Sequence, residues 1–253
     1  MLVSIAQAQL FLLVMTRILA ILLQVPVFGS AMIPTQVKIA LGVILSIIMV
    51  PWQPLPQGTV EMSVFPFAFA VLQELIIGFL AGFAATLTFG ALQIAGKVID
   101  LGSGFASGQI FNPTIGETAS ALDQLFLMIV MLFFLVINGH HDFLLAIQKT
   151  FSFAPVMKPL IDLTPTRLLE TSAVLITTGV QIALPVFGAL FMADLAFGLL
   201  ARVAPQMNVF FLGLPVKILI TMVGLGLLFT VIFPLIGQLF REMGLKVIGI
   251  LGV

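Results

Sequence analysis

The chain consists of long apolar runs separated by short segments that are polar or rich in glycine and proline. The runs are Leu10 to Phe28, Ile39 to Val50, Val64 to Ala95, Leu125 to Ile137, Leu168 to Val203 and Ile218 to Phe240. A helix needs about 20 apolar residues to span a bilayer, so two runs are short and two are long. We therefore predict an all-α membrane protein with about six long, partly broken hydrophobic helices arranged in hairpins.

Prolines and glycines within the runs predict local features of these helices. Pro185 in the fifth run and Pro234 in the sixth each remove a backbone donor, which predicts a kink. The third run contains Gly78 and Gly82 at a spacing that lets two helix backbones approach closely. This pattern is compatible with packing inside the chain and with a dimer interface.

The segment from Gly96 to Gly116 interrupts the apolar pattern. It contains the dipeptide Asn112-Pro113, which favours a turn, and five glycines: Gly96, Gly102, Gly104, Gly108 and Gly116. Irregular backbone is tolerated at membrane depth only where protein buries it or where it lines an aqueous cavity. We therefore predict a re-entrant or pore-facing loop over residues 96–121.

The segment from His140 to Arg167 contains three prolines and mixed charges, which predicts an extramembrane connection with at most a short helix. It suggests a division into an N-terminal part (1–145), a connecting segment (146–167) and a C-terminal helical hairpin (168–253). The consecutive residues His140, His141 and Asp142 lack the spacing of metal ligands, so we expect a solvated turn there and no metal site.

Composition supports a membrane protein. Hydrophobic residues make up 61% of the chain and charged residues 8%, against about 45–50% and about 25% in soluble domains. Ten basic and ten acidic residues balance, which gives no footprint for nucleic acid. Cysteine is absent, which excludes thiolate chemistry, and the lack of tyrosine with a single tryptophan removes the usual interfacial belts. Much of the surface is therefore expected to contact protein.

The basic residues give no clear orientation. With six spans, one side holds five lysines and arginines in its loops (Lys149, Lys158, Arg167, Arg241 and Lys246) and the other four (Lys38, Lys97, Arg202 and Lys217). Either partners set the orientation or the runs are not conventional spans. No basic segment precedes the first run, which carries Arg17, so we expect the N-terminus to be retained.

Three charged residues lie away from the ends of the apolar runs: Arg17, Glu74 and Asp194. A charge at bilayer depth costs a few kcal/mol unless it is paired or hydrated, so each is a candidate functional residue. They could form structural ion pairs, within the chain or with another subunit, or serve a proton relay, which would need several aligned acids. No nucleotide, hydrolase or metalloprotease motif is present, so we expect no catalytic residues and no cofactor.

Between the fifth and sixth runs lies the most specific stretch of the chain, from Arg202 to Lys217. Pro205 is expected to end one helix, Asn208 to form a turn, Gly213-Leu214-Pro215 a second bend, and Lys217 to begin the last helix. The run PQMNVFFLGLPVK resembles the FliR family of flagellar export-gate proteins, whose virulence counterpart is the SctT family. The resemblance extends to the order of the runs, the loop GFASGQIFNP and the cationic tail, and the long loop is more similar to the flagellar branch.

This resemblance implies a subunit of the FliP-FliQ-FliR export gate in the bacterial inner membrane at the flagellar basal body, with its core raised toward the periplasm. It implies a FliP-like N-terminal part, a FliQ-like C-terminal hairpin, and a channel for unfolded rod, hook and filament subunits. It further implies neighbouring FlhB-like and FlhA-like export components. None of these implications involves a cofactor or nucleic acid.

Two sets of residues become site hypotheses. The loop would plug the channel through Phe105, Gln109, Ile110, Phe111, Asn112 and Pro113, although burial purely for packing is the alternative. Assembly and docking would use Arg202, Pro205, Asn208, Phe210, Phe211, Gly213, Pro215 and Lys217. The competing function is a proton-coupled secondary transporter of small solutes, which would suit broken helices and buried acids. No internal repeat supports that class, and a membrane enzyme would need a catalytic constellation.

Overall fold

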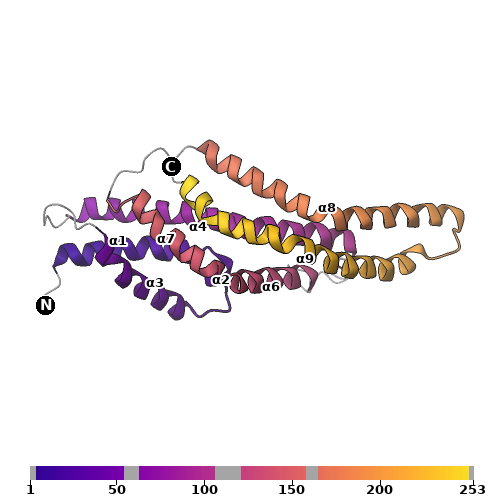
Figure 1. The fold of residues 1–253 in the computed structure, drawn as a ribbon, viewed down its shortest axis with the longest axis horizontal. Coiled ribbons are helices and arrows are strands. Elements are labelled where there is room, and N and C mark those ends of the chain that lie inside the picture. Colours follow the sequence, from indigo (N-terminus) through magenta and orange to yellow (C-terminus); the bar gives the residue numbers. More distant parts are fainter. Residues whose placement is uncertain (1–3, 54–62, 106–120, 158–164, 251–253) are drawn as a thin grey trace. The chain divides into compact units, whose positions relative to one another are not determined.

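The computed structural model describes residues 4–53, 63–105, 121–157 and 165–250, which are almost entirely helical and contain no strand (Figure 1). This confirms the prediction of an all-α membrane protein. A single 3-10 turn, Val50–Trp52, follows the third helix. The α-helices are α1 (Ile5–Leu22), α2 (Pro26–Gly29), α3 (Thr35–Met49), α4 (Val64–Ser103), α6 (Ala121–Val136), α7 (Gly139–Phe153), α8 (Pro165–Val203) and α9 (Val209–Ile250).

Five helical segments in the described part are long and apolar enough to cross a membrane. They lie in α1, in Thr35–Trp52, and in α4, α8 and α9. A sixth candidate is the pair formed by α6 and α7, which bend by 74° at a short break. Helix α4 has 40 residues and α9 has 42, which at 1.5 Å per residue is about 60 Å, roughly twice the hydrocarbon thickness.

The chain divides into two compact units. The first comprises Met1–Phe89, Asn138–Ser172 and Phe240–Val253, and the second comprises Gly90–Ile137 and Ala173–Leu239. Helices α4, α8 and α9 each contribute residues to both units. In the first unit α1 and α3 pack side by side (Figure 1). The predicted division into a FliP-like part and a FliQ-like hairpin is based on resemblance to other proteins, whereas these two units are defined by contacts within the chain. The predicted division therefore stays a prediction.

The predicted loop begins later than the sequence indicates. Helix α4 continues to Ser103, so residues 96–103, expected to be irregular, are helical. The reason is close packing: a Cβ on Gly96 would lie 3.1 Å from the Phe126 ring, and one on Gly102 would lie 3.1 Å from the Phe187 ring. The chain leaves the helix only at Gly104, whose φ of 82° favours glycine.

The second bend predicted at Gly213 to Pro215 is wrong, because α9 already begins at Val209. Asn208 precedes the helix and its side-chain oxygen accepts a hydrogen bond from the Phe211 backbone N–H at 3.4 Å. Pro215 removes one helical hydrogen bond, yet the helix persists because its early turns pack. A Cβ on Gly213 would lie 3.4 Å from the ring of Phe197 in α8.

The segment predicted as a mainly irregular connection contains helix α7. Its buried residues follow the helical period and form one face: Gly139, Phe143, Ala146, Ile147, Thr150 and Phe151. The prolines that suggested an irregular segment all follow its last residue. His141 and Asp142 are exposed in its first turn. The His140 Nδ1 atom is buried and has no hydrogen-bond partner among the described residues. The expected solvated turn is therefore helical.

The glycine pair of α4 packs against α1 inside the first unit. A Cβ on Gly78 would lie 2.7 Å from the Ala20 Cβ and from the Arg17 carbonyl oxygen. Polar contacts continue the interface, because Gln24 Nε2 donates to the Phe79 carbonyl at 3.0 Å. The glycine spacing was compatible with packing inside the chain and with a dimer interface, and the structure shows packing inside the chain.

We expect Gly78→Ala to destabilise the protein, because the atoms that oppose the new methyl group include backbone that cannot move independently. Overpacking of this kind costs about 1–3 kcal/mol, which exceeds the gain of about 1 kcal/mol from replacing a helical glycine. Gly90→Ala in the same helix meets no atom within 4 Å and serves as the matched control. Thermal melting of the protein in detergent would contradict this packing if both variants melted at the same temperature.

Candidate functional site

A buried ion pair lies in the first unit. Arg17, in the middle of α1, donates from Nε to Oε2 of Glu74 in α4 at 2.5 Å. The two side chains are 0% and 1% exposed. The close approach of α1 and α4 at Gly78, described above, lies one helical turn beyond Glu74 and brings the two charges within reach of one another.

The same guanidinium also holds helix α7. Its Nη1 donates to the carbonyl oxygens of Thr150 and Ala154, at 3.1 Å and 2.6 Å, and its Cζ lies 4.4 Å from the centroid of the Phe151 ring. These carbonyls belong to the last turn and the C-cap of α7, where a helix carries partial negative charge. Arg17 therefore joins three helices through a single side chain.

Two atoms of the pair have no hydrogen-bond partner in the part of the chain that the structure describes: Arg17 Nη2 and Glu74 Oε1. An incompletely satisfied buried pair gains little over an apolar pair of similar volume, but loss of one partner strands a buried charge. The arrangement is therefore suited to fixing helix positions. Glu74 is held by the guanidinium of Arg17, which suits a structural role better than the carrying of protons.

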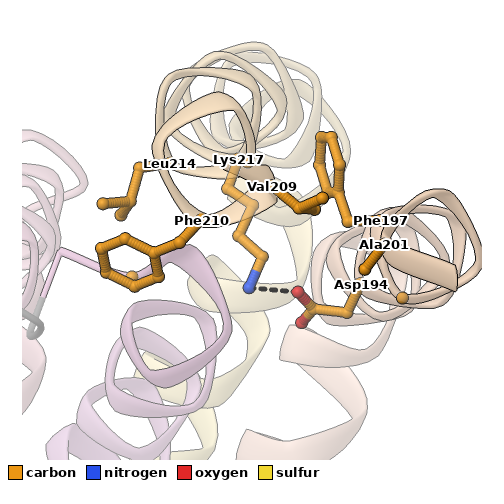
Figure 2. A pocket seen from close by; sticks show the side chains of 10 residues that line it. Asp194, Phe197, Ala201, Val209, Phe210, Leu214 and Lys217 are labelled. Atoms are coloured by element: carbon orange, nitrogen blue, oxygen red, sulfur yellow. Dashed lines mark ion pairs between the residues drawn. The ribbon is translucent and has the colours of Figure 1, made fainter. Parts of the chain in front are cut away.

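A second ion pair lies in the second unit, between Asp194 of α8 and Lys217 of α9. Figure 2 shows the two side chains pointing toward one another across a pocket. The pocket has a volume of about 240 Å³. The rest of its lining is apolar or glycine: Gly104, Phe197, Gly198, Ala201, Val209, Phe210, Gly213 and Leu214. Lys217 is 19% exposed and Asp194 is 49% exposed.

The residues of the predicted assembly motif lie at the turn between α8 and α9 and on the first turns of α9. Most are exposed: Arg202, Pro205, Asn208, Phe210, Phe211 and Pro215. Phe211 is 70% exposed, whereas Gly213 is buried and Lys217 is paired within the chain. The motif thus combines an exposed apolar surface with two residues that serve the internal packing of the hairpin.

Of the predicted plug residues, the structure describes Phe105 alone, which is half-buried. Its backbone N–H donates to the Ser103 hydroxyl at 3.1 Å, and that hydroxyl donates to the Asp100 carbonyl at 2.7 Å. The other plug residues, Gln109, Ile110, Phe111, Asn112 and Pro113, lie outside the described residues.

Sequence reasoning identified the three charges but not their partners. It missed the role of α7, whose signal is the apolar period from Phe143 to Phe151. It also placed Lys217 in an assembly motif without its internal acid, Asp194. Among the described residues, histidine, aspartate and glutamate nowhere form a group of three that could hold a metal ion.

We expect Arg17→Met to destabilise the protein by about 3–5 kcal/mol, because it leaves the Glu74 carboxylate buried without a cation. The double variant Arg17→Met/Glu74→Met should recover most of that loss. Lys246→Met is the control, since it breaks a partly exposed pair with Glu242 within α9 at 3.6 Å, worth at most about 1 kcal/mol. Melting temperatures and membrane levels report the result, and a double variant as unstable as the single one would contradict it.

Comparison with known proteins identifies the family. The sequence profile described as "Bacterial export proteins, family 1" matches residues 8–243. The flagellar biosynthetic protein FliR of Pectobacterium carotovorum subsp. carotovorum is 31% identical over 227 residues, which cover 89% of this chain and 86% of that protein. The FliR protein of Bacillus subtilis strain 168 is 29% identical over 235 residues, covering 91% and 90%.

A third relative shows comparable similarity. The FliR protein of Aquifex aeolicus strain VF5 is 31% identical over 208 residues, which cover 82% of this chain and 80% of that protein. The residues that the profile matches, 8–243, span the positions of both ion pairs and of the hairpin motif. The chain therefore belongs to the FliR family of bacterial export proteins and is a membrane-embedded export component of flagellar biosynthesis.

Proposed function

We propose that this chain is the FliR subunit of an export gate and forms, with FliP-like and FliQ-like subunits, a channel for unfolded rod, hook and filament subunits. Family membership supports this function. One structural observation supports assembly with other subunits. In α8 and α9 only 22% of each apolar span is buried within the chain, and in Thr35–Trp52 only 11%. Such surfaces need lipid or protein to cover them.

The composition indicates that protein, more than lipid, covers much of these apolar surfaces. Tyrosine is absent and Trp52 is the single tryptophan, so the side chains that usually anchor helices at the lipid interfaces are missing. The near-equal division of basic residues between the two sides also fits helices placed by partners. We therefore propose a location in the bacterial inner membrane at the flagellar basal body, with the core raised toward the periplasm.

The proposed plug begins where α4 ends. The turn at Gly104 leads into residues 106–120, and Phe105, Ile110 and Phe111 would supply an apolar constriction. Such a constriction blocks small ions by excluding water, whereas a polypeptide in transit displaces it. The glycines allow that displacement because they permit backbone angles closed to other residues.

The pairing of Glu74 and Asp194 with cations favours an assembly subunit over a proton-coupled transporter. Glu74 faces Arg17 and Asp194 faces Lys217, each within its own unit. A proton relay needs acids that can release and rebind a proton along a path. Carboxylates held by cations are better suited to structure, so we propose no transport of small solutes.

Deletion of residues 104–109 tests the plug. We expect ion conductance through the assembled gate to rise while secretion of flagellar subunits persists, because the constriction is shortened and the channel remains. The control is an equally long deletion of residues 54–59, which lie in a different segment between two apolar runs. Unchanged conductance in a normally assembled gate would contradict the proposed plug.

Phe211→Asp tests the assembly surface. Phe211 is 70% exposed on α9, and a charge there should weaken co-purification with FliP-like, FliQ-like and FlhB-like subunits about tenfold or more if it lies in an interface core. Phe211→Leu keeps the apolar surface and is the matched control. Lys217→Glu should also weaken assembly, but it breaks the internal pair, so it tests the surface less directly.

Both variants are compared at equal membrane levels of the chain, so that loss of folding is not mistaken for loss of assembly. If Phe211→Asp retains its partners as well as Phe211→Leu does, the hairpin tip is not an assembly surface.

A further inference from the structure

The end of α4 is embedded against α8 in the second unit. Besides its contact with Phe187, a Cβ on Gly102 would lie 3.2 Å from Leu190. Ser103 and Leu190 are both 0% exposed. Phe187, Leu190 and Asp194 are three and four residues apart, so they follow one face of α8. Asp194, the acid of the second ion pair, therefore lies on the same face of α8 as the residues that α4 contacts.

Gly104 lines the pocket that the second ion pair spans, and Lys217 enters it from α9. The pocket is therefore bounded by three helices, with the end of α4 as one wall (Figure 2). Lys217 is mostly buried, and its backbone carbonyl accepts a hydrogen bond from Thr221 Oγ1 at 2.8 Å. Asp194 is 49% exposed, so water screens the pair in part.

We propose that Asp194 and Lys217 are positioning residues that hold α8 and α9 together around the end of α4. The pair would thereby fix where the chain leaves α4 at Gly104 and enters the glycine-rich segment. The hairpin then has a role besides assembly, since it sets the starting point of the segment assigned to the plug. Only this functional consequence rests on the proposed function, while the positioning itself does not.

The absence of cysteine from the sequence allows a clean test. Ser103→Cys places a nearly isosteric thiol at a position that is 0% exposed, and Leu101→Cys places one at a position that is 77% exposed. Each is introduced into the full chain, which is purified as the assembled complex from a strain whose other gate subunits lack reactive cysteines. The rate of labelling by a soluble maleimide reports exposure at each position.

Loss of the pair should expose residue 103 selectively. Asp194→Asn and Lys217→Met retain most of the side-chain volume, and each should raise the labelling rate of Ser103→Cys by about three- to tenfold, because local opening becomes easier. The rate of Leu101→Cys should not change. Asp194→Glu, which keeps the charge, should retain the protection of residue 103.

The Glu242 and Lys246 pair of α9 supplies the matched control, since Lys246→Met removes a charge from the same helix without touching the pocket. The proposal is overturned if Ser103→Cys labels at the same rate with and without the Asp194 and Lys217 pair in intact complexes. It is also overturned if Lys246→Met raises that rate equally.

Ion conductance separates this proposal from the proposed function. If deletion of residues 104–109 leaves conductance unchanged, the plug is rejected, but the labelling rates still decide whether the pair positions α4. If both hold, Asp194→Asn should raise the conductance of the resting gate while membrane levels of the chain stay constant.

Discussion

The buried guanidinium of Arg17 is the constraint on which the first unit depends. Helices in a membrane gain little from burying apolar side chains against one another, so close packing and polar contacts must specify their arrangement. Arg17 meets this need by contacting Glu74 in α4 and the last carbonyls of α7. Gly78 lets α1 approach α4 closely enough for that contact. Charge and close packing thus specify the same arrangement of helices.

The second unit also combines an ion pair with close packing at glycines, and its ion pair is more exposed than that of the first unit. Asp194 and Lys217 pair across a pocket, while Gly102 and Gly213 bring neighbouring helices close to Phe187 and Phe197. Glu74 and Asp194 both face cations, so the structure gives neither of them the setting of a proton carrier. What it offers instead is two long apolar helices, α8 and α9, whose spans are only 22% buried within the chain. Such surfaces fit the proposed subunit of a larger gate.

The long helices could be predicted from sequence because hydropathy is a property of each run by itself. The errors fall where glycine or proline was judged by local backbone preference. Gly96 and Pro215 lie inside helices because packing against α6 and α8 outweighs that preference. The partners of Arg17 could not be predicted, since Glu74 lies 57 residues away and Ala154 lies 137 residues away. Only the folded chain brings them together.

The most direct test of the central claim is native mass spectrometry of the chain purified after co-expression with its candidate FliP-like and FliQ-like partners. Our account predicts one copy of this chain in a complex with several copies of small hydrophobic subunits, since its apolar helices need protein partners. A stable monomer or homodimer that excludes those subunits would contradict the account. That result would return the transporter to consideration despite the pairing of Glu74 and Asp194.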